Sequence, residues 1–169
     1  MNTDISQYIP SDFDDSSRVW IYQSSRMFTF SEALALEPML EAFKEQWNSH
    51  GKKVKGFANL LYGRFIVLMA DETVEPVSGC STDSSVRLIR QVEQAFNIQL
   101  FDRQSLAFII KDKIEAIPLS QLEYALQNGF LNENSLYFNN TVATKAELLQ
   151  HWISPIRETW LKRYLVSQP

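Results

Sequence analysis

Six consecutive apolar residues, Phe-Ile-Val-Leu-Met-Ala, complete a predicted strand at residues 64–70. The side chains of a strand point alternately to the two faces of its sheet. A strand that is apolar at every position must therefore be covered on both faces. This run predicts a central strand, which the neighbouring segments flank and cover.

Further strands are predicted before and after this one. Residues 18–23 are rich in β-branched and aromatic side chains, which is typical of a strand. Residues 54–61 lead through the turn Tyr62-Gly63 into the central strand, so these two strands are predicted to form a hairpin. Residues 106–110 and 114–118 are predicted to form a second hairpin.

Two amphipathic helices are predicted between these strands. Thr29 and Glu32 have the spacing of a capping box and begin the first helix, which we expect to end with Gly51 as its C-cap. The second helix is predicted over about residues 84–96. The first four predicted strands and these two helices follow the order strand-helix-strand-strand-helix-strand, which is that of a split βαβ unit. We therefore expect an α+β fold with a ferredoxin-like or related βαββαβ core and a C-terminal helical segment.

The chain of 169 residues is expected to form one α+β domain over residues 18–169, preceded by a flexible acidic lead-in, residues 1–17. C-terminal helices are predicted from about residue 120, with starts at Ser120, Thr144 and Ser154-Pro155. Their aromatic side chains are expected to pack on the core, and a homodimer through them is the alternative. These side chains are Trp152, Trp160 and Tyr164.

Composition narrows the function classes. The net charge of −4 argues against nucleic-acid binding, and the single cysteine excludes an internal disulfide. The first 17 residues do not have the pattern of a signal peptide, and no apolar run approaches the ~18 residues that span a membrane. We expect a soluble cytoplasmic protein without a membrane partner.

The predicted topology suggests a binding edge. In a ferredoxin-like core the strands at 18–23 and 64–70 are parallel neighbours, so their C-terminal ends share an edge with the N-termini of both helices. Asp71 and Glu72 also fall at this edge, whereas His50 and Asp102-Arg103 are expected at the opposite one. The predicted ligand-binding residues are Gln23, Ser24, Ser25, Arg26, Gly79, Cys80, Ser81 and Asp83.

Two residues of this edge are candidate nucleophiles. A helix N-terminus and Arg26 would favour the thiolate of Cys80, although the neighbouring carboxylates oppose it. Ser81 lies in a near match to the Gly-x-Ser-x-Gly elbow, and Asp102 and His151 follow in the order of α/β hydrolases. A small buried thiol and helix capping are the simpler interpretations. No metal site or cofactor is predicted.

Several segments together resemble a family of short uncharacterised bacterial proteins often labelled "ABC transporter ATPase". The resemblance spans roughly residues 18–164 and is carried by 18–26, 79–87 and 138–145, together with the closing Trp152, Pro155, Trp160 and Arg163. It implies one complete domain and assigns no catalytic residue. A phosphate-binding Walker A loop and the Leu-Ser-Gly-Gly-Gln signature are missing from the sequence, so ABC-type ATP hydrolysis is not expected.

The sequence therefore predicts a non-catalytic domain. We expect it to bind either a small ligand, neutral or anionic, or a protein partner at the edge formed by Arg26 and residues 79–83. The alternative is a transferase or hydrolase that depends on Cys80 or Ser81.

Overall fold

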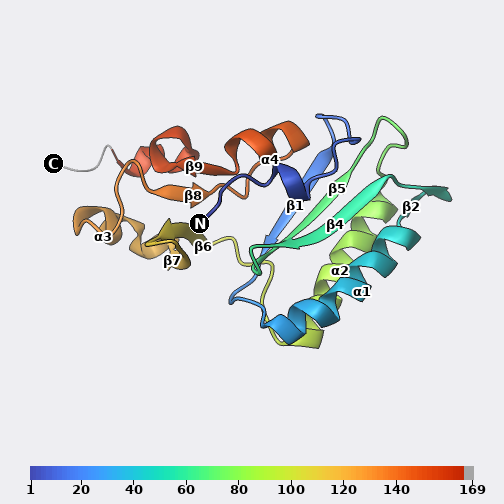
Figure 1. Cartoon of the computed structure of the whole chain (residues 1–169), viewed down its shortest axis with the longest axis horizontal. Coiled ribbons are helices and arrows are strands. Elements are labelled where there is room, and N and C mark those ends of the chain that lie inside the picture. Colours follow the sequence, from blue (N-terminus) through green and yellow to red (C-terminus); the bar gives the residue numbers. More distant parts are fainter. Residues whose placement is uncertain (166–169) are drawn as a thin grey trace. The chain divides into compact units, whose positions relative to one another are not determined.

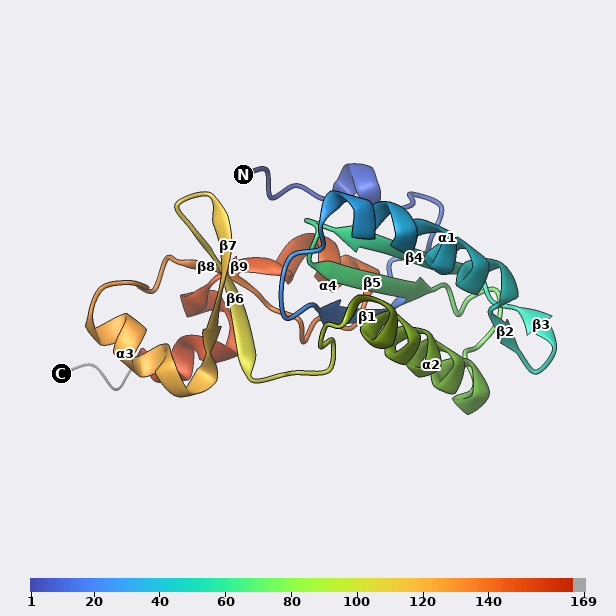
Figure 2. The ribbon, with the colours of Figure 1, turned by 90° about the horizontal axis from the view of Figure 1, so that it is seen from below.

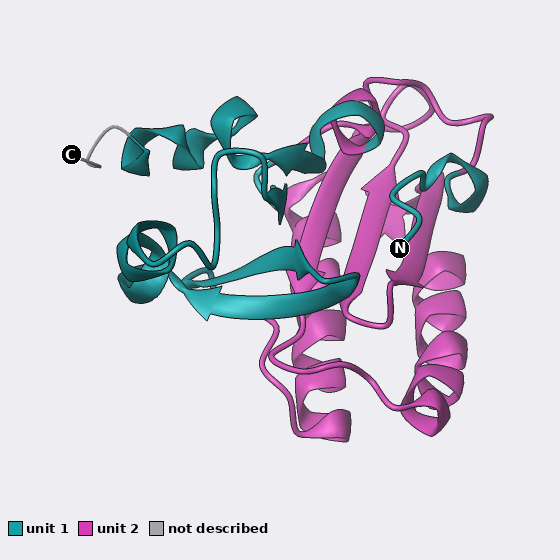
Figure 3. Ribbon diagram, turned by 60° about the vertical axis from the view of Figure 1, so that its left-hand side comes forward, with its two compact units in different colours: residues 1–9, 103–141, 149–169 teal, residues 10–102, 142–148 magenta. Residues whose placement is uncertain are grey.

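A computed structural model describes residues 1–165, which contain helices and antiparallel sheets (Figure 1). The α+β class is therefore confirmed. The chain divides into two compact units, which Figure 3 shows in different colours. Unit 2 comprises residues 10–102 and 142–148, and unit 1 comprises residues 1–9, 103–141 and the chain from 149 onward.

Unit 2 contains a three-stranded antiparallel sheet. Its strands are β1 (Arg18–Gln23), β4 (Gly56–Leu61) and β5 (Phe65–Ala70), in the order β1-β5-β4. All six side chains of β5 are buried, which confirms the central strand. The predicted parallel pairing of the first and third strands is wrong, because Arg18 pairs with Ala70 and Gln23 with Phe65.

Helices α1 (Phe30–Gln46) and α2 (Gly79–Phe96) cover one face of this sheet (Figure 2). Thr29 and Glu32 form the predicted capping box at the start of α1. The core between the helices and the sheet is apolar, and burial of such surface is the main favourable contribution to folding. It includes Tyr22, Leu36, Leu40, Ala58, Ile66, Leu68, Leu88, Ile89 and Val92.

Both helices have ends that differ from the prediction. Helix α2 begins at Gly79, five residues before the expected start, because Ser78 caps it and exchanges hydrogen bonds with Ser81. Helix α1 ends at Gln46, and the chain then forms a small hairpin of β2 (Asn48–Ser49) and β3 (Lys52–Lys53). The positive φ of Gly51 therefore serves the turn of this hairpin and does not cap a helix.

Unit 1 contains a four-stranded antiparallel sheet in the order β7-β6-β8-β9. These strands are β6 (Ser105–Ile110), β7 (Lys113–Pro118), β8 (Leu136–Phe138) and β9 (Ile153–Pro155). The second predicted hairpin is thus confirmed. Its first strand, β6, belongs to this separate sheet, whereas a ferredoxin-like βαββαβ core needs it beside β1, in the same sheet as β5.

Unit 1 also contains the short helix α3 (Leu122–Gln127). Helix α4 (Lys145–His151) is shared, because its residues up to Leu148 belong to unit 2 and the rest belong to unit 1. The remaining short elements are 3-10 helices: η1 (Ser6–Tyr8), η2 (Leu119–Gln121), η3 (Ile156–Glu158) and η4 (Trp160–Tyr164). Thr144 caps α4 as predicted, because its hydroxyl accepts from the backbone N–H of Glu147.

The helix predicted from Ser154-Pro155 is wrong. Ser154 belongs to β9, and the extended backbone of Thr159 separates η3 from η4. Helix α3 also has no side-chain cap, so the predicted start at Ser120 is wrong. Trp160 and Tyr164 pack against the core of unit 1, as does the buried Leu161. The apolar residues of the N-terminal segment, Ile5, Ile9 and Phe13, are buried as well.

None of the helices found between residues 1 and 165 is both long enough and apolar enough to cross a membrane.

Gly56 begins β4 where the indole of Trp47 packs directly on the backbone. A Cβ atom at Gly56 would lie 2.6 Å from the Trp47 ring. We expect Gly56→Ala to lower the free energy of unfolding by about 1–3 kcal/mol, because the buried indole must shift. Urea denaturation measures this effect. Gly79→Ala is the matched control, since a Cβ there meets nothing within 4 Å; equal stability of the two variants would contradict the prediction.

Candidate functional site

The two halves of the predicted binding edge lie at opposite ends of α2. The Arg26 guanidinium donates to the carbonyl oxygen of Phe96 (2.8 Å), the last residue of α2. Gly79 is the first residue of this 18-residue helix, whose length is about 27 Å. The predicted juxtaposition of Arg26 with residues 79–83 is therefore wrong. Its cause is the antiparallel pairing of β1 with β5, which places the end of β1 opposite the start of β5.

The first half, residues 23–26, makes structural contacts. Arg26 binds both carboxylate oxygens of Glu32, at 2.8 and 2.9 Å, and so joins the end of β1 to the start of α1. This bond and the backbone N–H of Thr29 lower the pKa of Glu32 to about 2. Ser24 is buried, and its carbonyl oxygen accepts from the Arg64 side chain. Ser25 bonds Gln99 through its backbone, and Gln23 is buried.

The second half, residues 79–83, is the first turn of α2. Ser81 is fully buried, and its hydroxyl donates to the carbonyl oxygen of Asn48 (2.7 Å). The backbone carbonyl of Ser81 accepts from the Trp47 indole (3.0 Å), so this residue joins the start of α2 to the end of α1. Cys80 and Asp83 are exposed. The arrangement favours helix capping by Ser81 over nucleophilic catalysis.

The structure places His50 near the start of α2, at the end opposite to the one expected. It lies in the turn after β2, whose residues Asn48 and Ser49 bond Ser81 and Pro76. Within residues 1–165 the side chains of His50 and Cys80 form no hydrogen bond or ion pair with any group. Asp102 and His151 belong to different compact units.

Asp71 follows β5 and holds the segment before β1. Its carboxylate is almost fully buried and accepts from the Thr73 hydroxyl (2.5 Å) and the backbone N–H of Asp14 (3.1 Å). Lys55 lies 3.4 Å away. These hydrogen bonds, that of Thr73 above all, lower the pKa of Asp71 to about 2. In the part of the chain that the structure describes, no group of three or more histidine, cysteine or carboxylate side chains forms a metal site.

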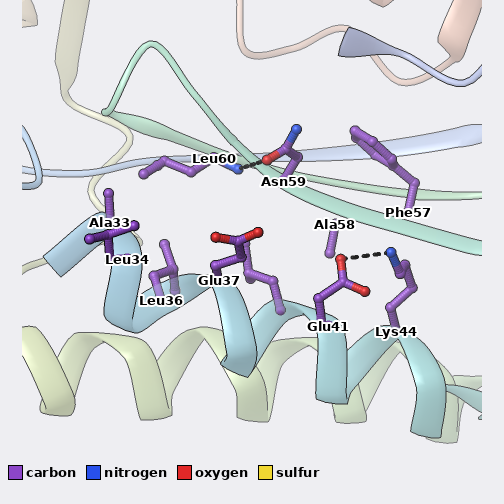
Figure 4. A pocket seen from close by; sticks show the side chains of 11 residues that line it. Ala33, Leu34, Leu36, Glu37, Glu41, Lys44, Phe57, Ala58, Asn59 and Leu60 are labelled. Atoms are coloured by element: carbon purple, nitrogen blue, oxygen red, sulfur yellow. Dashed lines mark hydrogen bonds and ion pairs between the residues drawn. The ribbon is translucent and has the colours of Figure 1, made fainter. Parts of the chain in front are cut away.

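The structure reveals a different candidate site at the edge of the three-stranded sheet. Strand β4 pairs with β5 on one side, and within residues 1–165 no strand pairs with its other side. A groove of about 430 Å³ lies between this edge and α1 (Figure 4). The lining residues of α1 are Ala33, Leu34, Leu36, Glu37, Leu40, Glu41 and Lys44, and those of β4 are Phe57, Ala58, Asn59 and Leu60.

The backbone N–H and C=O groups of successive residues in β4 point alternately to the two sides of the strand. The carbonyl oxygen of Lys55 accepts from Asp71, so odd-numbered residues point toward β5. The N–H of Leu60 instead bonds the Asn59 side chain (2.9 Å), which places it on the open side. The N–H and C=O groups of Gly56 and Ala58 therefore also point to the open side, as alternation in an antiparallel pair requires.

The opposite edge of the sheet is covered by the chain itself. The N–H of Val19 in β1 donates to the carbonyl oxygen of Ala143 (2.9 Å), and Arg18 bridges Thr144. Lys145 is buried, its backbone N–H bonds Ser17, and its ammonium donates to the carbonyl oxygen of Phe13 (2.6 Å). Proteins commonly protect sheet edges by such coverage, by charges or by proline. Residues 56–61 contain neither a charge nor a proline.

The groove combines apolar and acidic surface. Leu34 lies below Leu60 at one end of the groove, and its side chain is 54% exposed. Glu37 follows near the middle, and Glu41 pairs with Lys44 (2.8 Å) toward the other end (Figure 4). This groove lies outside the binding edge that the sequence predicts. The available signal was the spacing of Glu37, Glu41 and Glu45, which places three carboxylates on one helix face.

No family model, curated protein or solved structure matches this chain. The resemblance to the proteins labelled "ABC transporter ATPase" therefore stays a prediction, and the groove is interpreted from its geometry.

A structural role for Ser81 predicts a loss of stability on substitution. We expect Ser81→Ala to lower the free energy of unfolding by about 1–2 kcal/mol, because the Asn48 carbonyl and Ser78, the N-cap of α2, lose their hydrogen bonds to the Ser81 hydroxyl. Cys80→Ala, at the exposed neighbouring position, should change it by less than about 0.5 kcal/mol. Chemical denaturation of both variants measures the difference, and an unchanged stability of Ser81→Ala would contradict the role.

The low pKa of Asp71 predicts a pH-dependent contribution to stability. Because the pKa is about 2 in the folded chain and about 3.9 when unfolded, the contribution is fully present above pH 4. It declines as the pH falls through 4 toward 2, where the folded state also binds the proton. The melting temperature of the wild type should therefore approach that of Asp71→Asn over this range. Asp15→Asn serves as the exposed control, and a constant difference between wild type and Asp71→Asn would contradict the prediction.

Proposed function

We propose that unit 2 is a non-catalytic module that binds an extended segment of a partner protein. The segment would add as a fourth strand to the open edge of β4, with its side chains in the groove above α1. The open edge is the observation that carries this proposal. Strand addition satisfies main-chain groups along the whole edge, while pockets beside it select side chains.

The groove supplies what strand addition needs. The open-side backbone groups of Gly56, Ala58 and Leu60 offer a ladder for a partner strand. Within residues 1–165 the Leu60 N–H donates to the Asn59 side-chain oxygen, and a side-chain amide can rotate away when a partner strand binds. The exposed Leu34 beside Leu60 provides an apolar contact for one side chain of the segment.

A second copy of this chain is the less favourable occupant. An antiparallel pairing of two β4 edges places both α1 helices on the same face of the joined sheet, side by side. The carboxylates of Glu37 and Glu41 would then face those of the other copy, and like charges at such spacing repel. The charge of the groove therefore favours a different partner.

Amide hydrogen exchange tests the proposal most directly. The probe is a peptide selected on the full chain from a random displayed library. Its addition should slow exchange at Ala58 and Leu60, whose N–H groups face the open side, and leave Phe57 and Asn59 little changed because they already bond β5. Failure to select any peptide, or protection without this alternation, would overturn the proposal.

A substitution in the groove gives an independent test. Leu34→Gln should reduce the affinity for the selected peptide about tenfold, because a buried apolar contact is lost. The chain should remain folded, since Leu34 is already exposed. Leu149→Gln changes another exposed leucine and is the matched control. Sedimentation of the chain alone must show a monomer, because a dimer that the peptide dissociates would identify a second copy as the occupant.

A further inference from the structure

The order of charges along the groove has a consequence for the partner, which rests on the proposed function. Glu37 lies near the middle of the groove, and within residues 1–165 its carboxylate forms no ion pair or hydrogen bond. Glu41 is already paired with Lys44. Glu37 is therefore the carboxylate of the groove that is available to a partner.

Lysines and carboxylates lie together at the start of β4. Lys44 lines the groove and also a second hollow of about 470 Å³, which is lined further by Lys53, Lys55 and Gly56 and by the carboxylates of Asp12 and Glu45. Lys55 is occupied, because its ammonium lies 3.4 Å from both Asp12 and Asp71. The side chain of Lys53 is exposed and forms no ion pair or hydrogen bond with the part of the chain that the structure describes.

These features lie in one order along β4. Leu34 and Leu60 form the end of the groove near the close of the strand, and Glu37 lies in the middle (Figure 4). Lys53 precedes the strand by three residues and lines the second hollow. A segment that pairs antiparallel with β4 enters beside Leu60 and leaves beside Gly56. Antiparallel ladders are somewhat more stable per residue than parallel ones.

We propose that the groove selects an extended segment in which an apolar residue comes first, a basic residue second and an acidic group last. The apolar side chain contacts Leu34, the basic side chain pairs with Glu37, and a carboxylate pairs with Lys53. The acidic group is an aspartate, a glutamate or the C-terminal carboxylate of the partner. The reverse order places like charges against each other at both positions.

Two peptides of identical composition test this order. The peptide selected on the chain is synthesised with lysine before glutamate, and again with these two residues exchanged. Fluorescence polarisation measures both affinities at low and physiological salt. The form with lysine first should bind about fivefold more tightly, and the ratio should shrink as salt rises, because the pairs are exposed.

Charge-reversed variants then show which residues cause the preference for one order of lysine and glutamate in the peptide. The double variant E37K/K53E should prefer the exchanged peptide, whereas D83K/R87E, which reverses one acidic and one basic side chain on α2, should keep the original preference. Equal binding of the two peptides, or a preference that E37K/K53E leaves unchanged, would overturn this inference while the proposed function stands. Binding of neither form, with no protection of Ala58 and Leu60, would overturn both.

Discussion

The antiparallel pairing of β1 with β5 determines most of unit 2. Strand β5 is buried at all six positions, so both of its faces must be covered, and it carries a partner strand on each side. With β1 running against it, the end of β1 lies beside the start of β5. Residues 24–26 consequently meet the end of α2, while Asp71 meets the segment that precedes β1. The sheet direction thus separates the polar segments that the sequence places after successive strands.

The two edges of this sheet differ in whether another segment of the chain bonds them. Residues 143–146 return to bond the β1 edge through their backbone, and the ammonium of Lys145 is buried against a carbonyl oxygen there. The β4 edge retains its open-side N–H and C=O groups above α1. Unpaired edges promote association with other strands. The proposed partner binding rests on this edge, which has neither a charge nor a proline, and on the groove beside it. Leu34 is exposed there, and within residues 1–165 the Glu37 carboxylate forms no ion pair.

Local patterns predicted individual elements well. The strand at 18–23, the hairpin around Tyr62-Gly63 and the capping box of Thr29 are all found in the structure, because each depends on residues close in sequence. The start of α2 was misplaced for an equally local reason. Ser78 and Ser81 form a reciprocal cap, but serine is a weaker signal than the glutamate of the usual capping box. The predicted C-terminal helix does not form, because Thr159 adopts an extended backbone that the spacing of apolar residues does not reveal.

The candidate site, in contrast, cannot be predicted from local patterns. Its prediction required strand direction, which the order of elements leaves open: strand-helix-strand-strand-helix-strand fits both a parallel and an antiparallel neighbour for the first strand. The segment Gly79–Asp83 was expected to form a binding edge with Arg26 and proved to be the first turn of a helix that bonds β2. Glu37, Glu41 and the β4 edge were visible in the sequence only as separate features.

The sequence by itself determined a central apolar strand, two amphipathic helices and two hairpins, because apolar periodicity and turn residues act over a few positions. Only the tertiary structure decided which strands are neighbours, in which direction they run and which edge remains open. Those choices depend on contacts between residues far apart in the chain, such as Arg18 with Ala70 and Val19 with Ala143. They moved the best candidate for function from the start of α2 to the groove between α1 and β4.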